Sequence, residues 1–190
     1  MKKISLNAGT LLAPVPPVLV SCGTLEKPNV FTVAWTGILC TRPPMTYISV
    51  RPSRFSHEII RENGEFAINL PTDRLVRAVD LCGIKSGRDC DKFELSGLHV
   101  CASEKLSVPL IEESPLSLEC RVTEIKQLGT HDMFMAEIVG IAADKELVDA
   151  SGRIRFDKCG LLAYSHGEYY SLGKKIGYFG FSVRKKRKKH

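Results

Sequence analysis

Two arginines and two serines stand in the stretch VRPSRFSHEII, residues 50–60, where a strand-like run passes into a helix-like run. Ser53 and Ser56 can cap a helix that begins here, and the first free N–H groups of a helix attract anions. Arg51 and Arg54 are unexpected, because a cation at a helix start is unfavourable by roughly 0.3 kcal/mol or more unless an anion compensates it. A guanidinium group that binds a phosphate would reverse that effect. The residues alone leave two interpretations open, a plain capped helix and a phosphate cradle.

Other motifs for nucleotide and hydrolase chemistry are absent from the sequence. The chain has no G-x-G-x-x-G after a strand, no G-x-x-x-x-G-K-[ST] and no G-x-S-x-G. Its seven cysteines form no C-x-x-C pair and its five histidines form no H-E-x-x-H motif, so we expect no metal site. An odd number of scattered cysteines in apolar surroundings is typical of a reducing compartment, and we expect a cytoplasmic protein.

The positive charge of the chain is concentrated at its C-terminus. The net charge is +6, but six of the 27 basic residues form the run 184–189, and the other 21 balance 21 acidic residues. We expect residues 183–190 to be a solvated, disordered tail and do not expect nucleic acid as a partner. The apolar N-terminal stretch is interrupted by Asn7, Gly9 and several prolines, so we expect neither a signal peptide nor a membrane span.

The elements that must position the two arginines are mainly strands. Runs rich in Val, Ile, Phe, Tyr and Thr predict strands at residues 18–22, 30–35, 46–50 and 65–70. Apolar residues at helical spacing predict a helix within residues 53–64, which Asn63-Gly64 would end.

A second helix is predicted within residues 72–83. Thr72 or Asp73 can cap its start, its apolar residues lie on one side, and Gly83 would end it.

The second half of the chain contains a long hairpin candidate, with arms at residues 115–129 and 130–144. We expect Met133, Met135 and Ile138 to carry the apolar content of the second arm. In the first arm, apolar residues alternate with polar ones: Leu116, Leu118, Cys120 and Val122. Six or more strands, two short helices and no repeating βαβ rhythm favour a mainly β fold, an antiparallel barrel, over a doubly wound sheet.

Six segments together resemble the flavin reductase-like, FMN-binding split-barrel family, and within it the flavoredoxin branch. They follow one another in the family's order between about residues 18 and 182: NVFTVAWTG, SVRPSRFSHEII, INLP, CGIKSGRDCDKF, LGTHDMFMAEIVG and LGKKIGYFGFS. The resemblance implies one domain over residues 1–182, a six-stranded antiparallel split β-barrel with short flanking helices. It also implies a homodimer that holds FMN at the subunit interface.

The resemblance assigns the cofactor-binding residues segment by segment. For the phosphate it implies Arg51, Pro52, Ser53, Arg54 and Ser56, with Thr32 beside them. For the flavin ring and its polar edge it implies Asn29, Ala34, Trp35, Thr36, Cys40 and Tyr164. For the ribityl chain and the side of the ring it implies Cys82, Gly83, Ser86, Gly87 and Lys92. His131 is the candidate catalytic residue, near the reacting edge of the flavin or the nicotinamide.

The function that the resemblance implies is an FMN-dependent oxidoreductase. NADH or NADPH would reduce the bound FMN, and the electrons would pass to a flavin, ferric iron or a redox protein partner. The alternative is a flavoredoxin-type electron carrier or ferric reductase that does not turn over NAD(P)H itself. A third hypothesis, from another class of protein, is a small barrel that binds nucleic acid through the basic tail.

Overall fold

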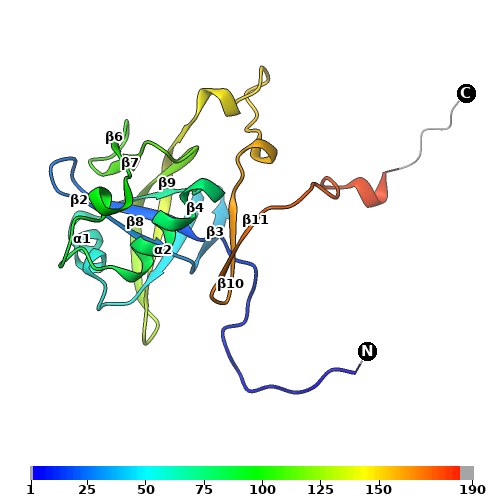
Figure 1. Cartoon of the computed structure of the whole chain (residues 1–190), viewed down its shortest axis with the longest axis horizontal. Helices are drawn as coiled ribbons and strands as arrows, with labels where there is room; N and C mark the ends of the chain where they lie inside the picture. Colours follow the sequence, from blue (N-terminus) through cyan, green and yellow to red (C-terminus); the bar gives the residue numbers. More distant parts are fainter. Residues whose placement is uncertain (1, 185–190) are drawn as a thin grey trace, which may run out of the picture.

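The computed structural model describes residues 2–184, which form a mainly β body with both chain ends running out from it (Figure 1). Seven antiparallel strands make the main sheet, in the order β2-β1-β5-β8-β9-β4-β3. Their bounds along the chain are β1 Val18–Gly23, β2 Pro28–Val33, β3 Thr36–Thr41, β4 Pro44–Val50, β5 Glu65–Asn69, β8 Leu116–Gln127 and β9 Asp132–Ala143. Two small antiparallel pairs accompany this sheet: β6 Val100–Ala102 with β7 Pro109–Ile111, and β10 Leu162–Ser165 with β11 Glu168–Ser171.

Short helices connect and cover the strands. The α-helices are α1 Phe55–Asn63, α2 Val76–Ile84 and α3 Lys92–Ser96. Single turns of 3₁₀ helix are η1 Asp73–Leu75, η2 Lys145–Leu147, η3 Phe156–Lys158 and η4 Phe181–Val183.

Six of the seven main strands share one core. The buried cluster inside the sheet takes apolar residues from β1, β2, β4, β5, β8 and β9, and α1 adds Ile60. The sheet curls so that the end of β2 meets β4, where the Ser49 N–H donates to the Trp35 carbonyl oxygen at 2.9 Å. The mainly β barrel class predicted from the sequence is therefore confirmed.

Within the main sheet, β3 is the one strand that was not located from the sequence. It pairs with β4 at the edge of the sheet, and its residues are intermediate or exposed. Ile38 and Leu39 are among the exposed large apolar side chains of the body.

The outer face of β1 and β2 carries a second core. Leu19 and Val30 pack there against α2 and α3, with Val79, Cys82 and Phe93 among the covering residues. Because successive residues of β1 alternate between the two cores, all six of them are buried. Both α1 and α2 pack against β1 and β2, so these two strands position the two helices relative to each other.

The predicted helix ends need correction. The αL residue Gly64 ends α1, as expected, and its N–H donates to Ile60 O at 2.9 Å. The predicted serine cap is wrong, because Ser56 lies inside the first turn and the N-cap position belongs to Arg54. Gly83 does not end α2, which continues to Ile84.

The start of the second predicted helix also differs. Residues 73–75 form the 3₁₀ turn η1, and α2 begins only at Val76. Thr72 is the N-cap of η1, but its side chain makes no capping hydrogen bond.

The hairpin β8–β9 is confirmed, but the apolar face of its second arm is only partly the predicted one. Ile138 packs against the core as expected, whereas Phe134 and Ala136 enter the core in place of Met133 and Met135. The register explains this difference, because Phe134 lies opposite the fully buried Ile48 of β4 and directly paired residues share a face.

Two further predictions concern the chain ends. Within residues 2–184, no helix is long and apolar enough to span a membrane. Of the predicted tail at 183–190, positions 185–190 lie outside the described residues.

Candidate functional site

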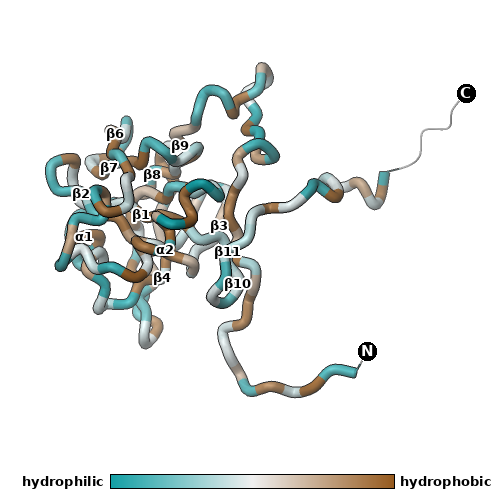
Figure 2. The backbone as a smooth tube through the Cα atoms, viewed as in Figure 1, coloured by the Kyte–Doolittle hydropathy of each residue, from teal (hydrophilic) through white to brown (hydrophobic). Residues whose placement is uncertain are grey.

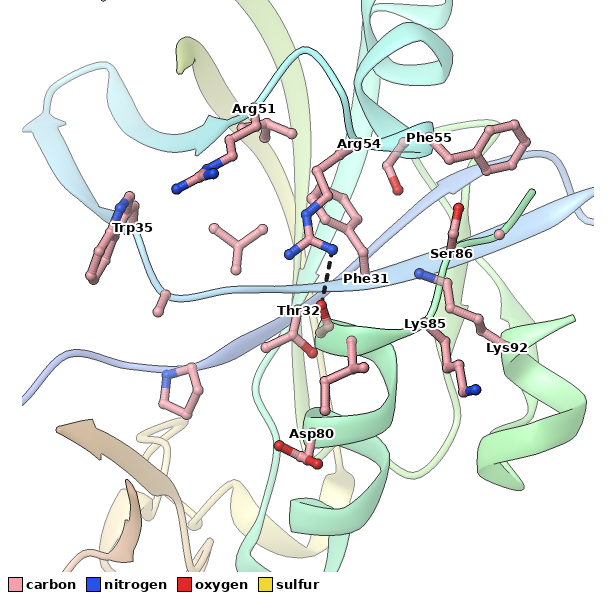
Figure 3. A pocket seen from close by; sticks show the side chains of 18 of the residues that line it. Phe31, Thr32, Trp35, Arg51, Arg54, Phe55, Asp80, Lys85, Ser86 and Lys92 are labelled. Atoms are coloured by element: carbon pink, nitrogen blue, oxygen red, sulfur yellow. Dashed lines mark hydrogen bonds between the residues drawn. The ribbon is translucent and has the colours of Figure 1, made fainter. Parts of the chain in front are cut away.

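A cavity of about 860 Å³ opens between β2, the start of α1, the end of α2 and the hairpin β10–β11. Figure 3 shows Arg51 and Arg54 on one side of it, with Thr32 on the floor and Asp80 and Lys85 opposite. Its size is typical of pockets that hold cofactors.

The first turn of α1 forms one wall of the cavity and has no side-chain cap. The N-cap residue Arg54 has extended backbone angles, φ −71° and ψ 134°, and its side chain does not bond the helix amides. A helix start of this kind presents unpaired N–H groups and the positive end of the helix dipole. Here those groups belong to Phe55 and Ser56, both of which line the cavity.

Asn29 of β2 holds the Ser56 side chain in place. Ser56 is buried, and its Oγ accepts a hydrogen bond from Asn29 Nδ2 at 2.7 Å. Because Ser56 Oγ accepts from Asn29, its position at the edge of the cavity is fixed by the side chain behind it. Asn29 also donates weakly to Cys22 Sγ, and burial raises the pKa of that thiol to about 11.

The segment after α2 is interlocked with the start of α1. Arg54 Nη1 donates to Gly83 O at 2.9 Å, and in the opposite direction Arg88 Nη1 donates to Ser53 O at 3.1 Å. The Arg88 guanidinium also lies over the Phe55 ring, 5.4 Å from its centroid. These contacts fix residues 51–56 and the loop that follows α2 as one unit.

Gly87 is the point of closest approach in this unit. A Cβ atom there would lie 2.3 Å from Asn29 Oδ1 and 2.7 Å from Phe55 Cδ1. No other residue type fits without displacing both neighbours.

The cavity has a strong excess of positive charge. Its lining contains one acidic residue, Asp80, and five cations: Arg51, Arg54, Lys85, Arg88 and Lys92. None of the five forms a salt bridge with another residue in the described part of the chain. An anionic ligand is the missing partner that this charge distribution favours.

Lys92 is the buried member of this group. It is 4% exposed, and its Nζ makes only a long 3.4 Å hydrogen bond to Cys82 O. Burial lowers the pKa of Lys92, and the nearby thiols act in the opposite direction. The ammonium group has three N–H donors, and only one of them has a partner, through a long hydrogen bond. The group is therefore well placed to bind a ligand atom.

His131 enters the cavity beside Arg51. Burial and, secondarily, the Arg51 charge lower the pKa of His131, which favours the neutral imidazole. Thr130 Oγ1 lies 3.0 Å from its Nδ1. A neutral histidine can donate or accept a hydrogen bond at this edge of the cavity.

Aromatic rings complete the walls. Trp35 follows β2, and Phe31 lies on the floor strand. Tyr164 and Tyr169 of the hairpin β10–β11 lie with ring centroids 5.4 Å apart. Tyr169 Oη donates to Asp80 Oδ1 at 3.3 Å, and burial together with that carboxylate raises the pKa of Tyr169 to about 12. A flat aromatic ligand would find both apolar contact and hydrogen-bonding edges here.

The structure brings most of the sequence-predicted site residues together. Thirteen line this one cavity: Thr32, Ala34, Trp35, Arg51, Ser53, Arg54, Ser56, Gly83, Ser86, Gly87, Lys92, His131 and Tyr164. Five do not line it: Asn29, Thr36, Cys40, Pro52 and Cys82. Asn29 instead supports Ser56 from behind and lines a smaller adjoining cavity.

Several predicted polar side chains are engaged elsewhere. The Thr32 hydroxyl donates to Val79 O at 2.5 Å and so fastens β2 to α2. The Thr36 hydroxyl donates to Tyr47 O at 2.6 Å. The Cys40 thiol on β3 donates to Arg42 O, just after that strand, and burial raises the pKa of the Cys82 thiol.

The cavity also contains residues that the sequence interpretation passed over. Lys85 and Arg88 belong to the segment CGIKSGRDCDKF, and their charge was a visible signal. Phe31 belongs to the quoted segment NVFTVAWTG, and Phe55 to SVRPSRFSHEII. Asp80 had no local signal, because only the tertiary fold brings α2 against Tyr169 of β11.

Comparisons with known proteins agree with this picture. A sequence model described as "Flavin reductase like domain" matches residues 11–173. The structure of a flavoredoxin of Desulfovibrio vulgaris superposes with a TM-score of 0.89 at 30% identity, covering 96% of this chain and 100% of that one.

Two curated relatives extend the comparison. An uncharacterized protein of Archaeoglobus fulgidus is 33% identical over 82% of this chain and 88% of its own length. A protein of Pantoea ananatis named FMN reductase (NADH) RutF is 23% identical over 77% of this chain and 68% of its own.

Proposed function

This chain belongs to the flavin reductase-like family, and from that premise we propose that it binds FMN in the main cavity and acts as an NAD(P)H-dependent flavin oxidoreductase. The observation that carries the proposal is the uncapped start of α1, surrounded by cations that have no carboxylate partner. A phosphate dianion would satisfy both features at once.

The phosphate of FMN would lie at residues 51–56, which we call the cradle. Arg51 and Arg54 would supply guanidinium donors, and Ser53 and Ser56 would supply hydroxyls. The Ser56 hydroxyl is already oriented by Asn29. Lys92 would approach from the opposite wall.

The ring of the flavin would lie toward Trp35 and the tyrosines of the hairpin β10–β11. When bound, FMN supplies the hydride and electron chemistry, so the protein must bind, orient and shield. His131, neutral and next to Arg51, would hydrogen bond the reacting edge or the nicotinamide. Trp35 and Tyr164 would cover the flat faces and exclude water.

A first experiment tests binding. Purified protein is mixed with FMN, desalted, and examined for flavin absorption bands. Retention of about one flavin per chain supports the proposal. Protein that stays colourless contradicts it.

A second experiment tests turnover. NADH or NADPH oxidation is measured with FMN, FAD, riboflavin and ferric complexes as acceptors. Turnover with any of them supports the oxidoreductase.

The similarity to flavoredoxin favours a second candidate, an electron carrier or ferric reductase that a separate reductase supplies. This candidate predicts a bound flavin that is reduced by chemical reductants or by a protein partner, with no turnover of NADH or NADPH. The turnover measurement therefore separates the two functions.

We also propose that the protein is a homodimer with FMN at the subunit interface. The support is apolar surface left uncovered by the body. Figure 2 shows hydrophobic stretches along both chain ends, which run out from the barrel. Ile38 of β3 is 66% exposed, and large apolar side chains on the ends are also exposed: Leu6, Leu11, Leu12, Ile176 and Phe179. A second copy would cover such patches. Light scattering after gel filtration tests this proposal, and a monomeric mass contradicts it.

We further propose a cytoplasmic location and a redox protein as electron acceptor. All seven cysteines are free, which suits a reducing compartment.

A further inference from the structure

His57 and Asp132 form a buried polar pair beneath the cavity wall. His57 Nε2 and Asp132 Oδ2 are 2.8 Å apart, and the two residues are 6% and 7% exposed. The His57 ring also meets the Phe134 ring edge-on, with centroids 5.1 Å apart. Neither residue lines the cavity, so neither can touch a ligand there.

The position of Asp132 in the sheet gives this pair a special geometry. Asp132 begins β9 and lies opposite Val50, the last residue of β4. The cradle leaves the sheet directly after Val50. The chain then turns through residues 51–54 and returns in the first turn of α1, where His57 bonds the Asp132 side chain. One residue of β9 therefore holds both ends of the cradle.

The same residue connects the cradle with His131, the candidate catalytic residue. His131 precedes Asp132 and lies near enough to Arg51 for that charge to lower its pKa. The Leu128 N–H donates to His131 O at 2.9 Å and closes the β8–β9 turn. A shift of Asp132 would move Arg51, the first turn of α1 and His131 together.

We infer that Asp132 and His57 are positioning residues that set the geometry of the cradle for the phosphate of a bound flavin nucleotide. The inference rests on the proposed function, because it assumes that FMN binds with its phosphate at residues 51–56. Charge-assisted hydrogen bonds weaken steeply with misalignment, so loss of the anchor costs phosphate affinity before it costs affinity for the flavin ring.

The test compares FMN with riboflavin, which lacks the phosphate, on purified apoprotein. In Asp132→Ala we expect the Kd for FMN to rise at least tenfold, while the Kd for riboflavin changes less than threefold. Asp132→Asn keeps a hydrogen bond to His57 and should restore the FMN-to-riboflavin ratio to within about threefold of the wild-type value.

A matched control removes an equally buried polar contact away from the cavity. The Ser117 hydroxyl donates to Asn69 Oδ1 at 2.7 Å. Ser117→Ala should lower thermal stability but leave the FMN-to-riboflavin ratio unchanged. If Asp132→Ala weakens both ligands equally, or neither, the pair has only a structural role and the inference is overturned.

A measurement on the wild-type protein covers the case in which Asp132→Ala does not fold. The ring signals of His57 in NMR spectra should shift on saturation with FMN and stay unchanged with riboflavin. Equal responses to the two ligands would overturn the inference. A wild-type protein that binds FMN no more tightly than riboflavin would instead refute the cradle, and with it the proposed mode of FMN binding.

Discussion

Two helices, α1 and α3, begin beside the main cavity, and their first turns differ in what satisfies the free backbone N–H groups. At α3 the N-cap Asp91 accepts from Phe93 N at 2.9 Å and from Glu94 N at 3.2 Å. At α1 the N-cap is Arg54, with no side-chain cap. One start is complete within the chain, and the other is left open.

The difference shows how a stable scaffold can contain an unsatisfied element. An aspartate or serine at position 54 would cap α1 and stabilise it by about 1 kcal/mol. The chain instead has an arginine, which directs its donors toward Gly83 O and the cavity. The missing cap lowers the stability of α1 alone. The burial of β1 and β2 between two cores stabilises the fold and offsets this loss. We interpret the open start as reserved for an anionic ligand.

The largest effect is expected when both cradle arginines are removed. The double substitution Arg51→Ala and Arg54→Ala eliminates two charge-assisted contacts, each worth about 1.5–3 kcal/mol when fully formed. Both side chains are exposed, so the lower end applies, and the Kd for FMN should rise roughly 100-fold. Isothermal titration with FMN and riboflavin measures this change, and riboflavin should be affected less than threefold.

The matched control for this prediction is Arg61→Ala. Arg61 lies in the last turn of α1, pairs with Glu58 and does not line the cavity. It should leave both affinities unchanged. Equal losses for FMN and riboflavin in the double variant would contradict the assignment of the phosphate to the cradle.

A smaller effect on FMN affinity is expected when α1 is given the cap that it lacks, and this change should not lower the stability of the apoprotein. Arg54→Asp places a capping carboxylate at the helix start, at the loss of the hydrogen bond to Gly83 O. We expect the apoprotein to unfold at a temperature no lower than the wild type. The Kd for FMN should rise at least tenfold, because the new carboxylate occupies the amides and repels the phosphate.

Thermal unfolding without ligand and FMN titration together test this variant. A large loss of stability in the apoprotein would show that Arg54 is needed for the fold. That result would remove the contrast between the two helix starts.

The sequence singled out residues 51–56 as a candidate anion site, but the serine cap that it predicted there is wrong. The residues of the cradle could be found because two arginines at a helix start conflict with local propensity, and such conflicts mark functional sites. The serine cap was wrong because propensity places a hydroxyl near a helix start without fixing which residue begins the helix. Ser56 lies two positions after the N-cap Arg54 and so falls inside the first turn, where Asn29 holds it.

Other parts of the site depend on tertiary contacts that no local pattern encodes. Thr32 lines the cavity as predicted, but its hydroxyl donates to Val79 O of α2, a contact that no local pattern shows. The face of β9 was also misjudged, because Met133 and Phe134 are both apolar and only the pairing with β4 decides which side is buried. The strand positions were predicted well, because β-branched runs between turn residues give a strong local signal.

The smallest effect is expected at the helix start that is already complete. Asp91→Ala leaves two amides of α3 without their acceptor and should destabilise the protein by about 1 kcal/mol, measured by urea unfolding of the apoprotein. Asp89→Ala, in the same loop but outside the cap, is the control and should change stability by less than about 0.5 kcal/mol. FMN affinity should stay within threefold of wild type in both variants, because the amides at α3 bind their own aspartate and not the ligand. If Asp91→Ala weakened FMN as much as the loss of an arginine does, the two helix starts would share one function, and the division between a closed and an open start would have to be abandoned.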